Sequence, residues 1–395
     1  MSFIKINIQG SYVDSQLYSG RLFLWKFDGS FVIVNWNKLI DSLIVDDSDR
    51  IAFTLSFVDG SYLYKRTSAE LLKDDEFKNI FRNRFERISR RPITISEDFL
   101  ERFMIGKQNV PFDELPIDSE VYSNTVFLAT DQGLFQTAIS DLIDSNVIKR
   151  TTGKLWDARL LSITASNERI ALSAGSDGLF EIDLHKIERE RHMDLGTGVS
   201  IVSTRHSTFS NYSELSLYNS SVLGDSFMAL FTLQRDGTSG KKSRILIEEV
   251  EEELIFNGNG HSQHLSWGVD DKVYRATEDG VEIIRFNNFA NTQSGERFFE
   301  VLNNIKFAEW KGQILSGGAA HFGVIVECEN ALVVLRSDNE IDNLSGSVLR
   351  WRVFNRSRNY QNQLHIVKED KLEIYSFPHD YFVSQFQKTS GISVY

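Results

Sequence analysis

One short segment of this chain is rich in basic residues that could bind a negatively charged partner. Residues 78–91 hold a single acid, Glu86, and six basic residues. The basic residues are Lys78, Arg82, Arg84, Arg87, Arg90 and Arg91. Guanidinium groups bind carboxylates and phosphates in a planar, two-pronged geometry, so this segment suits an acidic protein partner or nucleic acid. The alternative is a helix packed on the fold with its arginines merely solvated, because any surface helix carries charge on its outward face.

A second group of arginines lies near the end of the chain and is interleaved with aromatic residues. The arginines are Arg350, Arg352, Arg356 and Arg358, and the aromatic residues are Trp351, Phe354 and Tyr360. Such a mixture can stack bases and neutralise phosphates. In a β-strand, however, Arg350 and Arg352 share one face and Trp351 lies on the other, which is also the pattern of an ordinary half-exposed strand. Both interpretations stay open, and we keep the four arginines as candidate partner contacts.

Catalytic and metal-binding patterns are weak by comparison. His261 and His264 are three residues apart, but the sequence has neither an HExxH motif nor paired CxxC motifs. Ser316 and His321 lack the GxSxG elbow of a serine hydrolase. Cys328 follows an apolar run, which favours a buried, inert thiol. We therefore predict no catalytic residue, no cofactor and no metal ligand.

Clusters of acidic residues leave two alternatives open. The pairs Asp46-Asp47 and Asp74-Asp75 could bind a cation. The run Glu248–Glu253 is interpreted as a solvated strand end and its turn, or else as an acidic edge for a basic partner.

Composition narrows the class of protein. The 395 residues include 43 Lys and Arg against 55 Asp and Glu, a formal net charge of −12. This charge argues against a protein that coats nucleic acid or anionic lipid over its whole surface, although a local basic patch is compatible with it. With one cysteine, no run of 18 apolar residues and no signal-like start, we expect a protein of the cytoplasm or another intracellular compartment that does not enter a membrane.

Short strands and a recurring turn organise the chain. Segments such as Arg21–Phe27 and Ala331–Leu335 are rich in β-branched and aromatic residues and are bounded by Asp, Gly, Asn and Ser. Hairpin turns recur at positions 29, 133, 178, 237, 280, 330 and 370, and they end in glycine at the first five and in Asn330 and Asp370 at the last two. After a first gap of 104 residues the spacing is 40 to 59, close to the roughly 40–50 residues of a propeller blade. We predict an all-β, seven-bladed β-propeller, with six or eight blades left open because Asp59-Gly60 could be a further hairpin turn.

We expect the blades to close into a ring, because an open array would leave unpaired sheet edges exposed. A long meander of antiparallel strands exposes edges that aggregate unless the array closes on itself. Residues 3–9 and 371–377 both have strand character. We expect these two terminal segments to pair in one blade.

Two stretches resemble WD40 repeats at the level of residues. One has Gly260-His261, an Asp279-Gly280 turn and a final Phe286-Asn287 in place of Trp-Asp, and the other contains Trp156-Asp157. The resemblance covers two or three of the seven repeats, so the chain is WD40-like without a subfamily. It implies that His261 and Asp279 form a structural hydrogen-bond relay that stabilises the blade.

The basic segment belongs to a predicted helical insertion. Between Arg66 and Pro111 the apolar period changes from 2 to about 3.6. Thr67–Glu70 fits a capping box, and a helix of roughly 20 residues is expected to end before Pro92, with a second helix starting at Ser96. We place the insertion at residues 67–106 of a single domain spanning residues 1–395.

These patterns favour a non-enzymatic scaffold within a multisubunit complex, which contacts proteins through its rims and its basic helical arm. Two alternatives remain: a nucleic-acid-binding subunit of a larger assembly, and a hydrolase or lyase with acids or histidines around the central channel.

Overall fold

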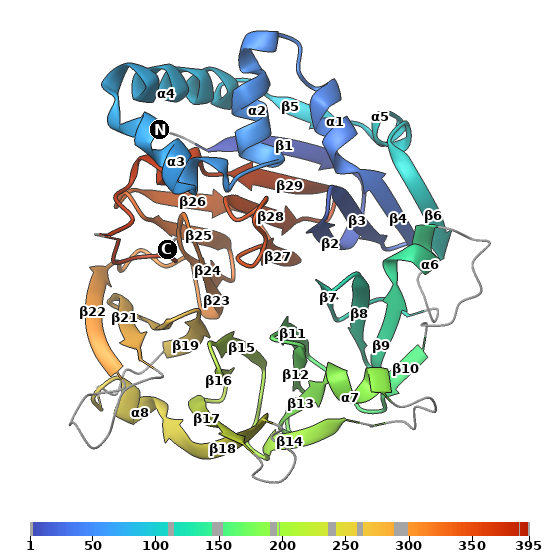
Figure 1. Ribbon diagram of the computed structural model, residues 1–395, viewed down its shortest axis with the longest axis vertical. Helices are drawn as coiled ribbons and strands as arrows, with labels where there is room; N and C mark the ends of the chain where they lie inside the picture. Colours follow the sequence, from blue (N-terminus) through green and yellow to red (C-terminus); the bar gives the residue numbers. More distant parts are fainter. Residues whose placement is uncertain are drawn as a thin grey trace.

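The computed structural model describes residues 3–109, 114–143, 153–189, 196, 198–235, 242–258, 264–287, 299–386 and 388–393. Over these residues the strands form six four-stranded sheets and one five-stranded sheet. The sheets stand around a central axis as blades (Figure 1). The chain is therefore a seven-bladed β-propeller, as predicted from the spacing of its turns.

Each blade is built from strands that follow one another outward from the axis. The first three blades are β2 (Tyr12–Tyr18), β3 (Arg21–Lys26), β4 (Ser30–Asn35) and β6 (Met104–Asn109); β7 (Asp118–Tyr122), β8 (Thr125–Thr130), β9 (Gly133–Ala138) and β10 (Gly153–Trp156); and β11 (Ser162–Ser166), β12 (Arg169–Ser173), β13 (Leu179–Asp183) and β14 (Val199–Ser203). The next three are β15 (Phe209–Ser213), β16 (Ser216–Ser220), β17 (Phe227–Arg235) and β18 (Lys242–Glu251); β19 (His264–Val269), β20 (Lys272–Thr277), β21 (Gly280–Phe286) and β22 (Phe299–Lys306); and β23 (Ile314–Ala320), β24 (Gly323–Cys328), β25 (Ala331–Arg336) and β26 (Ile341–Ser345). The seventh is β27 (Arg350–Val353), β28 (Gln363–Val367), β29 (Lys371–Ser376) and β1 (Ile4–Gln9), with β5 (Ile93–Ile95) beyond β1.

The middle strands explain the continuous apolar runs in the sequence. Neighbouring blades pack face to face, so a middle strand is covered on both sides and most side chains along it are buried. Residues 22–25 of β3 and all six residues of β25 are buried. A strand with one wet face would instead alternate apolar and polar residues.

The predicted turns join the second and third strands of six blades. Gly133 and Gly280 have φ values of 142° and 143°, and a Cβ on either would overlap a carbonyl oxygen of the neighbouring strand. In the fourth blade the prediction was wrong. The turn between β16 and β17 lies at residues 221–226, whereas Asp236-Gly237 falls between β17 and β18, outside the described residues.

The ring closes through the two ends of the described chain, which confirms the predicted terminal pairing. β1 pairs antiparallel with β29, from Ile4 opposite Ser376 to Gln9 opposite Lys371. The outer edge of β1 is covered by the parallel strand β5. Among the other outer strands, β6, β10, β14, β18 and β22 all carry a break in register typical of a β-bulge. Bulges twist an edge and hinder its pairing with foreign strands.

The helical insertion lies between β4 and β6, and it begins earlier than predicted. Its helices are α1 (Trp36–Ser42), η1 (Asp47–Asp49), α2 (Arg50–Phe57), η2 (Tyr62–Tyr64), α3 (Arg66–Ala69), η3 (Glu70–Lys73), α4 (Asp75–Ser89) and α5 (Glu97–Glu101). The predicted start at Thr67 was therefore wrong. α1 and α2 span only about two turns each, too few for an apolar period to stand out in the sequence.

Two local predictions in the insertion were also wrong, and one was confirmed. Asp59-Gly60 follows α2 and forms no hairpin; the Gly60 N–H donates instead to the Asn359 carbonyl at 2.7 Å. Residues 67–70 form no capping box, and α4 is capped by Asp74, whose side chain accepts from the N–H groups of Glu76 and Phe77. Ser96 does cap the second helix, α5, as predicted. The assignment of residues 1–395 to one domain stays a prediction.

Three short helices complete the fold: α6 (Ile139–Ile143), α7 (Leu184–Arg189) and α8 (Glu252–Ile255). A 3-10 helix, η6 (Pro378–Phe382), follows β29 and leads into the C-terminal segment. Within the described part of the chain, no helix is long and apolar enough to cross a membrane.

Candidate functional site

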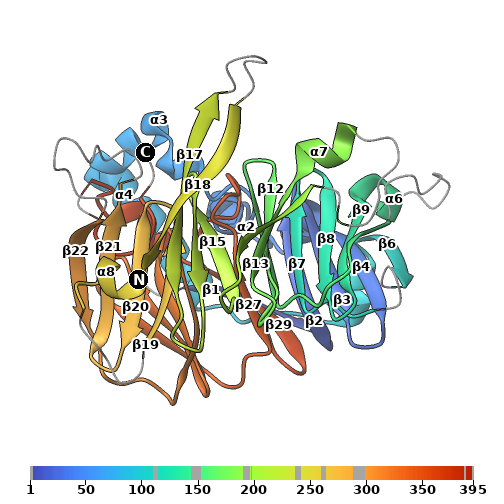
Figure 2. The ribbon, with the colours of Figure 1, turned by 90° about the horizontal axis from the view of Figure 1, so that it is seen from below.

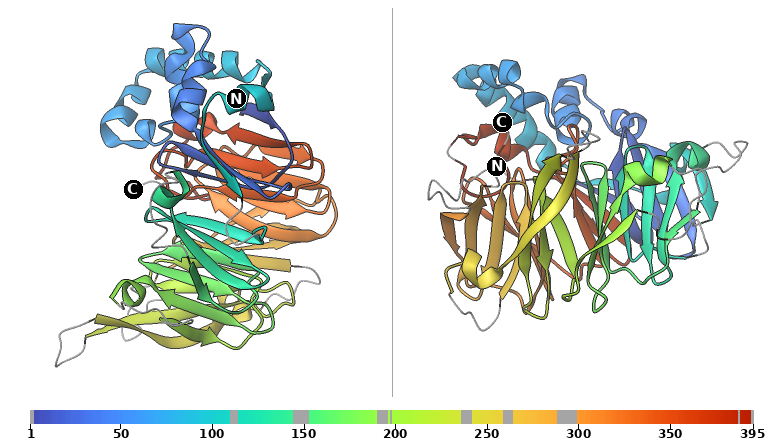
Figure 3. Two further views of the ribbon diagram at one scale, coloured as in Figure 1. Left: turned by 90° about the vertical axis from the view of Figure 1, so that its right-hand side faces the viewer. Right: turned by 60° about the horizontal axis from the view of Figure 1, so that its bottom comes forward.

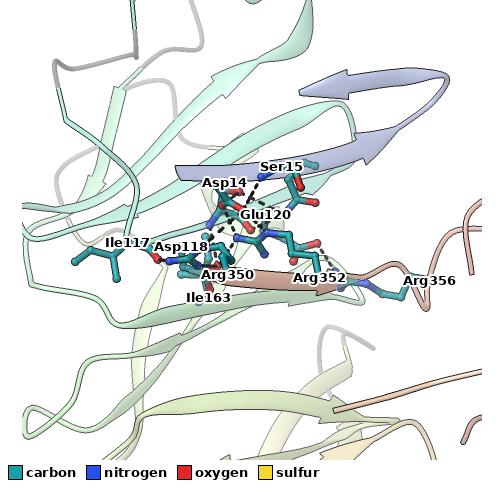
Figure 4. Close-up of polar contacts among 11 residues, drawn as sticks. Asp14, Ser15, Ile117, Asp118, Glu120, Ile163, Arg350, Arg352 and Arg356 are labelled. Atoms are coloured by element: carbon teal, nitrogen blue, oxygen red, sulfur yellow. Dashed lines mark hydrogen bonds and ion pairs between the residues drawn. The ribbon is translucent and has the colours of Figure 1, made fainter. Parts of the chain in front are cut away.

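The arginines of β27 face carboxylates on the inner strands of the two following blades (Figure 4). Arg352 donates from Nε to Asp14 Oδ1 at 2.6 Å and from Nη2 to Asp118 Oδ1 at 2.8 Å. Arg350 donates from Nη1 to the same Asp118 oxygen at 3.2 Å and from Nη2 to the Ile117 carbonyl. We call Asp14, Asp118, Glu120, Arg350, Arg352 and Arg356 the seam network, because it joins the last blade to the first and second.

The seam network extends to a third neighbour through backbone and hydroxyl groups. Asp118 Oδ2 accepts from the Ile163 N–H of β11 at 2.8 Å, and Ser119 Oγ donates to Asp14 Oδ2 at 2.7 Å. Four consecutive blades are therefore tied together next to the point where the ring closes.

Burial and neighbouring opposite charges together set the protonation states in the seam network. Burial alone would raise the pKa of Asp14, but Arg352 and Arg350 overcome it and hold that pKa below the usual value. Burial likewise opposes the charge of Arg352, and Asp14 with Asp118 more than restores it, so its pKa lies above the ordinary value. For Glu120 burial wins over Arg356 and Arg352, and its pKa is raised.

A buried histidine lies beside this network. His365 Nδ1 is 3.1 Å from Ser15 Oγ, in a fully buried contact between β28 and β2. Burial, reinforced by Arg352, lowers the pKa of His365 to about 3. The imidazole is therefore neutral at physiological pH.

Three acids do converge near the axis, as the channel-enzyme hypothesis required, but each faces an arginine. Arg356 pairs with Glu120, while Arg350 and Arg352 share Asp14 and Asp118. Among the described residues, no group of three or more His, Cys, Asp or Glu side chains is arranged to hold a metal ion. The chemistry of this arrangement is mutual neutralisation, which stabilises the contact between blades.

The second predicted arginine group is thus largely used inside the chain. The predicted alternation holds: Trp351 lies on the opposite face of β27, where Nε1 donates to Ser316 Oγ and Glu327 Oε2, both at 3.0 Å. The side chain of Arg352 is only 14% exposed and that of Arg350 25%. Arg358 is exposed. A partner-binding role for these arginines stays a prediction.

Helix α4 carries the first predicted group and lies on the periphery of the ring beside the closing blade (Figures 1 and 3). Its inner face is fixed by Phe85 and Ile88, both fully buried. The Phe85 ring lies 6.0 Å from that of Tyr381 in η6. The helix is therefore docked on the propeller along one face.

Four of the six bases of α4 and its C-terminal end have a contact within the chain. Arg91 Nη1 lies 2.9 Å from Asp49 Oδ2, and Arg87 pairs with the other oxygen of the same buried carboxylate. Arg82 lies over the Phe382 ring at 4.9 Å, and Arg90 is 3.8 Å from Glu86.

The two other bases lie beside exposed apolar side chains. Within the described residues, Lys78 and Arg84 have no acidic partner. Phe77 and Ile80 are 48% and 40% exposed, and with Arg84 they follow an i, i+3, i+7 spacing that places them along one face. Lys78 follows Phe77 directly and lies about 100° further round the helix. We call Phe77, Lys78, Ile80 and Arg84 the α4 patch. Exposed aromatic side chains beside an arginine are typical of protein-binding surfaces.

The C-terminal segment holds the insertion against the ring through a buried ion pair. Lys388 Nζ lies 2.8 Å from Asp380 Oδ1, and both side chains are fully buried. Tyr64 of the insertion and Ser337 also donate to Asp380, each at 2.5 Å. Burial alone would raise the pKa of Asp380, but Lys388 and these donors keep it below the usual value.

The acidic members of the seam were missed in the sequence, although a signal for them exists. Val13–Tyr18 reads Val-Asp-Ser-Gln-Leu-Tyr, and Ile117–Tyr122 reads Ile-Asp-Ser-Glu-Val-Tyr, on the inner strands of adjacent blades. The two final tyrosines play equivalent roles. Tyr18 Oη accepts from the Asn124 N–H at 3.2 Å, and Tyr122 Oη accepts from the Glu168 N–H at 3.0 Å.

The WD40-like relay and the metal-spaced histidines fall partly outside the described residues. His261 is not among them, whereas Asp279 lies in the turn between β20 and β21. His264 begins β19, where Nε2 is 3.4 Å from Glu252 Oε1. The relay stays a prediction.

An open cavity of about 380 Å³ lies elsewhere, lined by Glu214, Asp270, Asp271, Arg285, Phe286, Asn287 and Glu300. Burial first, and neighbouring aspartates second, raise the pKa values of Glu214 and Asp270. Arg285 lies 3.8 Å from Asp271 and 3.3 Å from Glu300. Nothing in this lining points to a particular ligand, and none of the predicted site residues contributes to it.

Comparison with known proteins supports no family assignment. The sequence matches no protein-family model and no curated protein. Among solved structures, the β-propeller domain of Cps50 (Swd1) from Myceliophteria thermophila has a TM-score of 0.48 at 7% identity, over 93% of this chain and 96% of that chain. The computationally designed Ika8 protein gives 0.46 at 8% identity over 95% and 100%, and the N-terminal domain of Nup159 gives 0.43 at 9% over 93% and 90%. We infer nothing about function from these likenesses.

Proposed function

We propose that this chain is a non-enzymatic β-propeller scaffold, which holds a protein partner within a larger complex inside the cell. The observation that carries the proposal is the α4 patch, where Phe77 and Ile80 are exposed and where Lys78 and Arg84 have no ion pair within the described part of the chain. Because α4 is fixed to the ring through the buried Phe85 and Ile88, it offers this patch with little loss of backbone entropy on binding.

The chemistry of the patch defines the partner. Lys78 and Arg84 have no acidic partner among the described residues, which favours a partner segment with carboxylates. The two apolar side chains require aliphatic or aromatic residues beside them. Nucleic acid is the weaker alternative, because Arg350 and Arg352 are neutralised by Asp14 and Asp118 and the chain carries a net charge of −12.

The test is affinity purification of the tagged full-length chain from its native host, followed by mass spectrometry. We expect Lys78→Glu with Arg84→Glu to remove at least one protein that the wild type retains. The matched control is Lys186→Glu with Lys306→Glu, which reverses the same charge at two exposed sites on α7 and β22. Identical protein sets from the α4 variant and the wild type would refute the proposal.

Two further measurements separate the partner classes. The same loss with Phe77→Ser and Ile80→Ser would show that the apolar anchors contribute. Gel shifts with single-stranded nucleic acid across a salt series test the alternative, because phosphate contacts weaken steeply with added salt.

A further inference from the structure

One corner of the fourth blade differs from the corresponding parts of the other blades. There residues 221–226 join β16 to β17, and α8 follows β18 directly. This turn is the longest of the seven that join a second strand to a third, and among the described residues α8 is the only helix on a connection between two blades. Figure 2 shows β17 and β18 rising beyond the neighbouring strands, and α8 lies at the opposite end of β18.

Hydrogen bonds place the turn beside α8. The Ser226 carbonyl accepts from the first N–H of α8 at 3.3 Å, and Ser226 Oγ accepts from the Ser221 N–H at 3.0 Å. Arg205, on the connection from the third blade, donates to Asp225 Oδ1 at 2.9 Å and to Glu251 Oε1 at 2.6 Å. The turn, the end of β18 and the neighbouring connection therefore form one joined surface.

This surface exposes three aliphatic side chains. Val222, Leu223 and Leu254 are 55%, 73% and 71% exposed. Of the other six turns, which the structure describes in full, only that of the first blade exposes a large apolar side chain. Contiguous exposed apolar residues mark interaction sites. We call residues 221–226 and 251–254 the α8 corner.

Hydrogen bonds, not the exposed aliphatic side chains, hold the turn in place. The Val222 N–H donates to Thr208 Oγ1 and the Leu223 N–H to Ser221 Oγ, both at 3.2 Å. Ser221 Oγ also lies 2.9 Å from His206 Nδ1. α8 is fixed by its last residue and the residue after it, which are both buried. The α8 corner is therefore preformed, and a partner binds it with little loss of conformational entropy.

Acidic side chains around the α8 corner outnumber the cations. Arg205 is shared by Asp225, Glu251 and Glu249, the last at 3.8 Å. Glu253 is exposed and has no ion pair within the part of the chain that the structure describes. One arginine thus faces four acids, which leaves an excess of three negative charges after the pairing with Arg205.

We propose that the α8 corner binds a segment of another protein that carries lysines or arginines beside aliphatic residues. The aliphatic side chains of this segment cover Leu223 and Leu254, and its cations face Glu253. Like-charge repulsion disfavours acidic segments and nucleic acid phosphates on the same surface. The acidic run Glu248–Glu253 is then an edge for a basic partner. The proposal is independent of the α4 patch, which is matched to an acidic partner and lies across the ring from α8 (Figure 1).

Fluorescence anisotropy with two labelled peptides tests this on the full chain. Both peptides are amphipathic helices of about 18 residues with leucine on one face, and the other face carries lysine in the first and glutamate in the second. We expect saturable binding of the lysine peptide only. Leu223→Ser with Leu254→Ser keeps every charge and should weaken that binding at least about tenfold.

Matched controls separate a specific surface from general attraction to an acidic protein. Val45→Ser with Ile201→Ser removes two aliphatic side chains that are 83% and 57% exposed elsewhere, and we expect unchanged affinity. Glu253→Lys should weaken binding, whereas Glu329→Lys, at the exposed turn of the sixth blade, should not.

Circular dichroism melting establishes that each variant is folded, and Leu254→Ser alone replaces the double variant if that variant does not fold. The proposal is overturned if the lysine peptide does not bind saturably, or if it binds the folded variant of the α8 corner as tightly as the wild type.

The alternative occupant is the basic α4 patch of a second copy of this chain. Sedimentation velocity decides between them, and we expect a monomer. Self-association that is lost both in Leu223→Ser with Leu254→Ser and in Lys78→Glu with Arg84→Glu would assign the α8 corner to a second copy and overturn the proposal of a separate partner. Failure of the peptide to bind leaves the α4 purification experiment unaffected.

Discussion

The seam network and helix α4 both bring arginines to carboxylates, but they do so in different surroundings. In the seam, Arg352 is 14% exposed and its partner Asp14 is fully buried. On α4, Arg87 is 49% exposed although its partner Asp49 is buried, and Lys78 and Arg84 have no acid among the described residues. Arginine density in a sequence therefore does not identify a binding surface, because the presence of a buried carboxylate decides whether the charge is available.

The difference has an energetic basis. A buried charge without an opposite charge beside it carries a large desolvation penalty. A seam arginine therefore stays paired with its acid and does not bind a partner protein. An exposed cation stays hydrated and contributes little until a partner arrives. We propose that the α4 patch is available for binding, because Lys78 and Arg84 have no ion pair among the described residues.

The strongest way to break the seam is to remove its most buried acid. Asp14→Ala leaves Arg352 and Arg350 with Asp118 alone, and we expect the free energy of unfolding to fall by about 3–5 kcal/mol. Chemical denaturation of the purified chain measures this. Lys73→Ala, in an exposed ion pair with Glu70, is the control and should cost less than about 1 kcal/mol. Equal losses of stability in the two variants would contradict the inference that the seam network stabilises the contact between the blades.

Lowering the pH should also destabilise the seam network while leaving the contacts of α4 unaffected. His365 has a pKa of about 3 in the fold against 6.5 ordinarily. Below pH 6.5 the unfolded chain gains a proton that the folded chain does not, so stability falls with decreasing pH, by about 1.4 kcal/mol per pH unit for this group. Unfolding curves between pH 7 and 4 should therefore be less steep in pH for His365→Asn than for the wild type.

His321 and His379, each with a pKa lowered to about 4 mainly by burial, contribute in both proteins and cancel in the difference. Parallel pH dependences of wild type and His365→Asn would show that His365 is not buried as a neutral group.

Reversing the two structural arginines of α4 should have an intermediate effect. Arg87→Glu with Arg91→Glu leaves the buried Asp49 facing two like charges, and we expect a loss of about 1–3 kcal/mol. The loss is smaller than in the seam because these guanidinium groups are partly in water. Thermal and chemical unfolding measure it. A variant as stable as the wild type would place Arg87 and Arg91 with the available cations instead.

The smallest effect on stability is expected at the α4 patch. Lys78→Glu with Arg84→Glu should change the free energy of unfolding by less than about 0.5 kcal/mol, because neither side chain has an acidic partner among the residues that the structure describes. The same variant should show the largest loss of partner capture. A clear drop in stability would mean that the patch supports the fold, and the contrast with the seam would disappear.

Much of the architecture was open to prediction because it depends on local chemistry. Gly133, Gly178 and Gly280 were identified as turns since a positive φ favours glycine at each place, and all three have φ above 100°. Residues 3–9 and 371–377 were paired because both have strand character and a ring needs closure. Ser96 was identified as a cap from the acids that follow it. Each of these features is readable within a few residues.

The errors arose where packing over long distances decides the structure. α1 and α2 are too short for a visible period, yet Trp36, Phe53 and Phe57 are fully buried in the core shared by the insertion and the adjoining blades. Asp59-Gly60 has the composition of a hairpin turn, but Gly60 bonds to Asn359 of the last blade. No window of sequence around either segment contains the partner that fixes its conformation.

The sequence by itself determined the strand repeat, the closure of the ring and the alternation of Arg350 and Arg352 with Trp351, because backbone preference and side-chain period are local properties. It favoured seven blades but left six or eight open. Only the tertiary structure decided which arginines form ion pairs inside the protein. Asp14 and Arg352 are separated by 338 positions in the chain, and they meet because the ring brings its first and last blades together. Whether an arginine can bind a partner protein depends on these long-range contacts, because an arginine paired with a buried carboxylate is not free to bind.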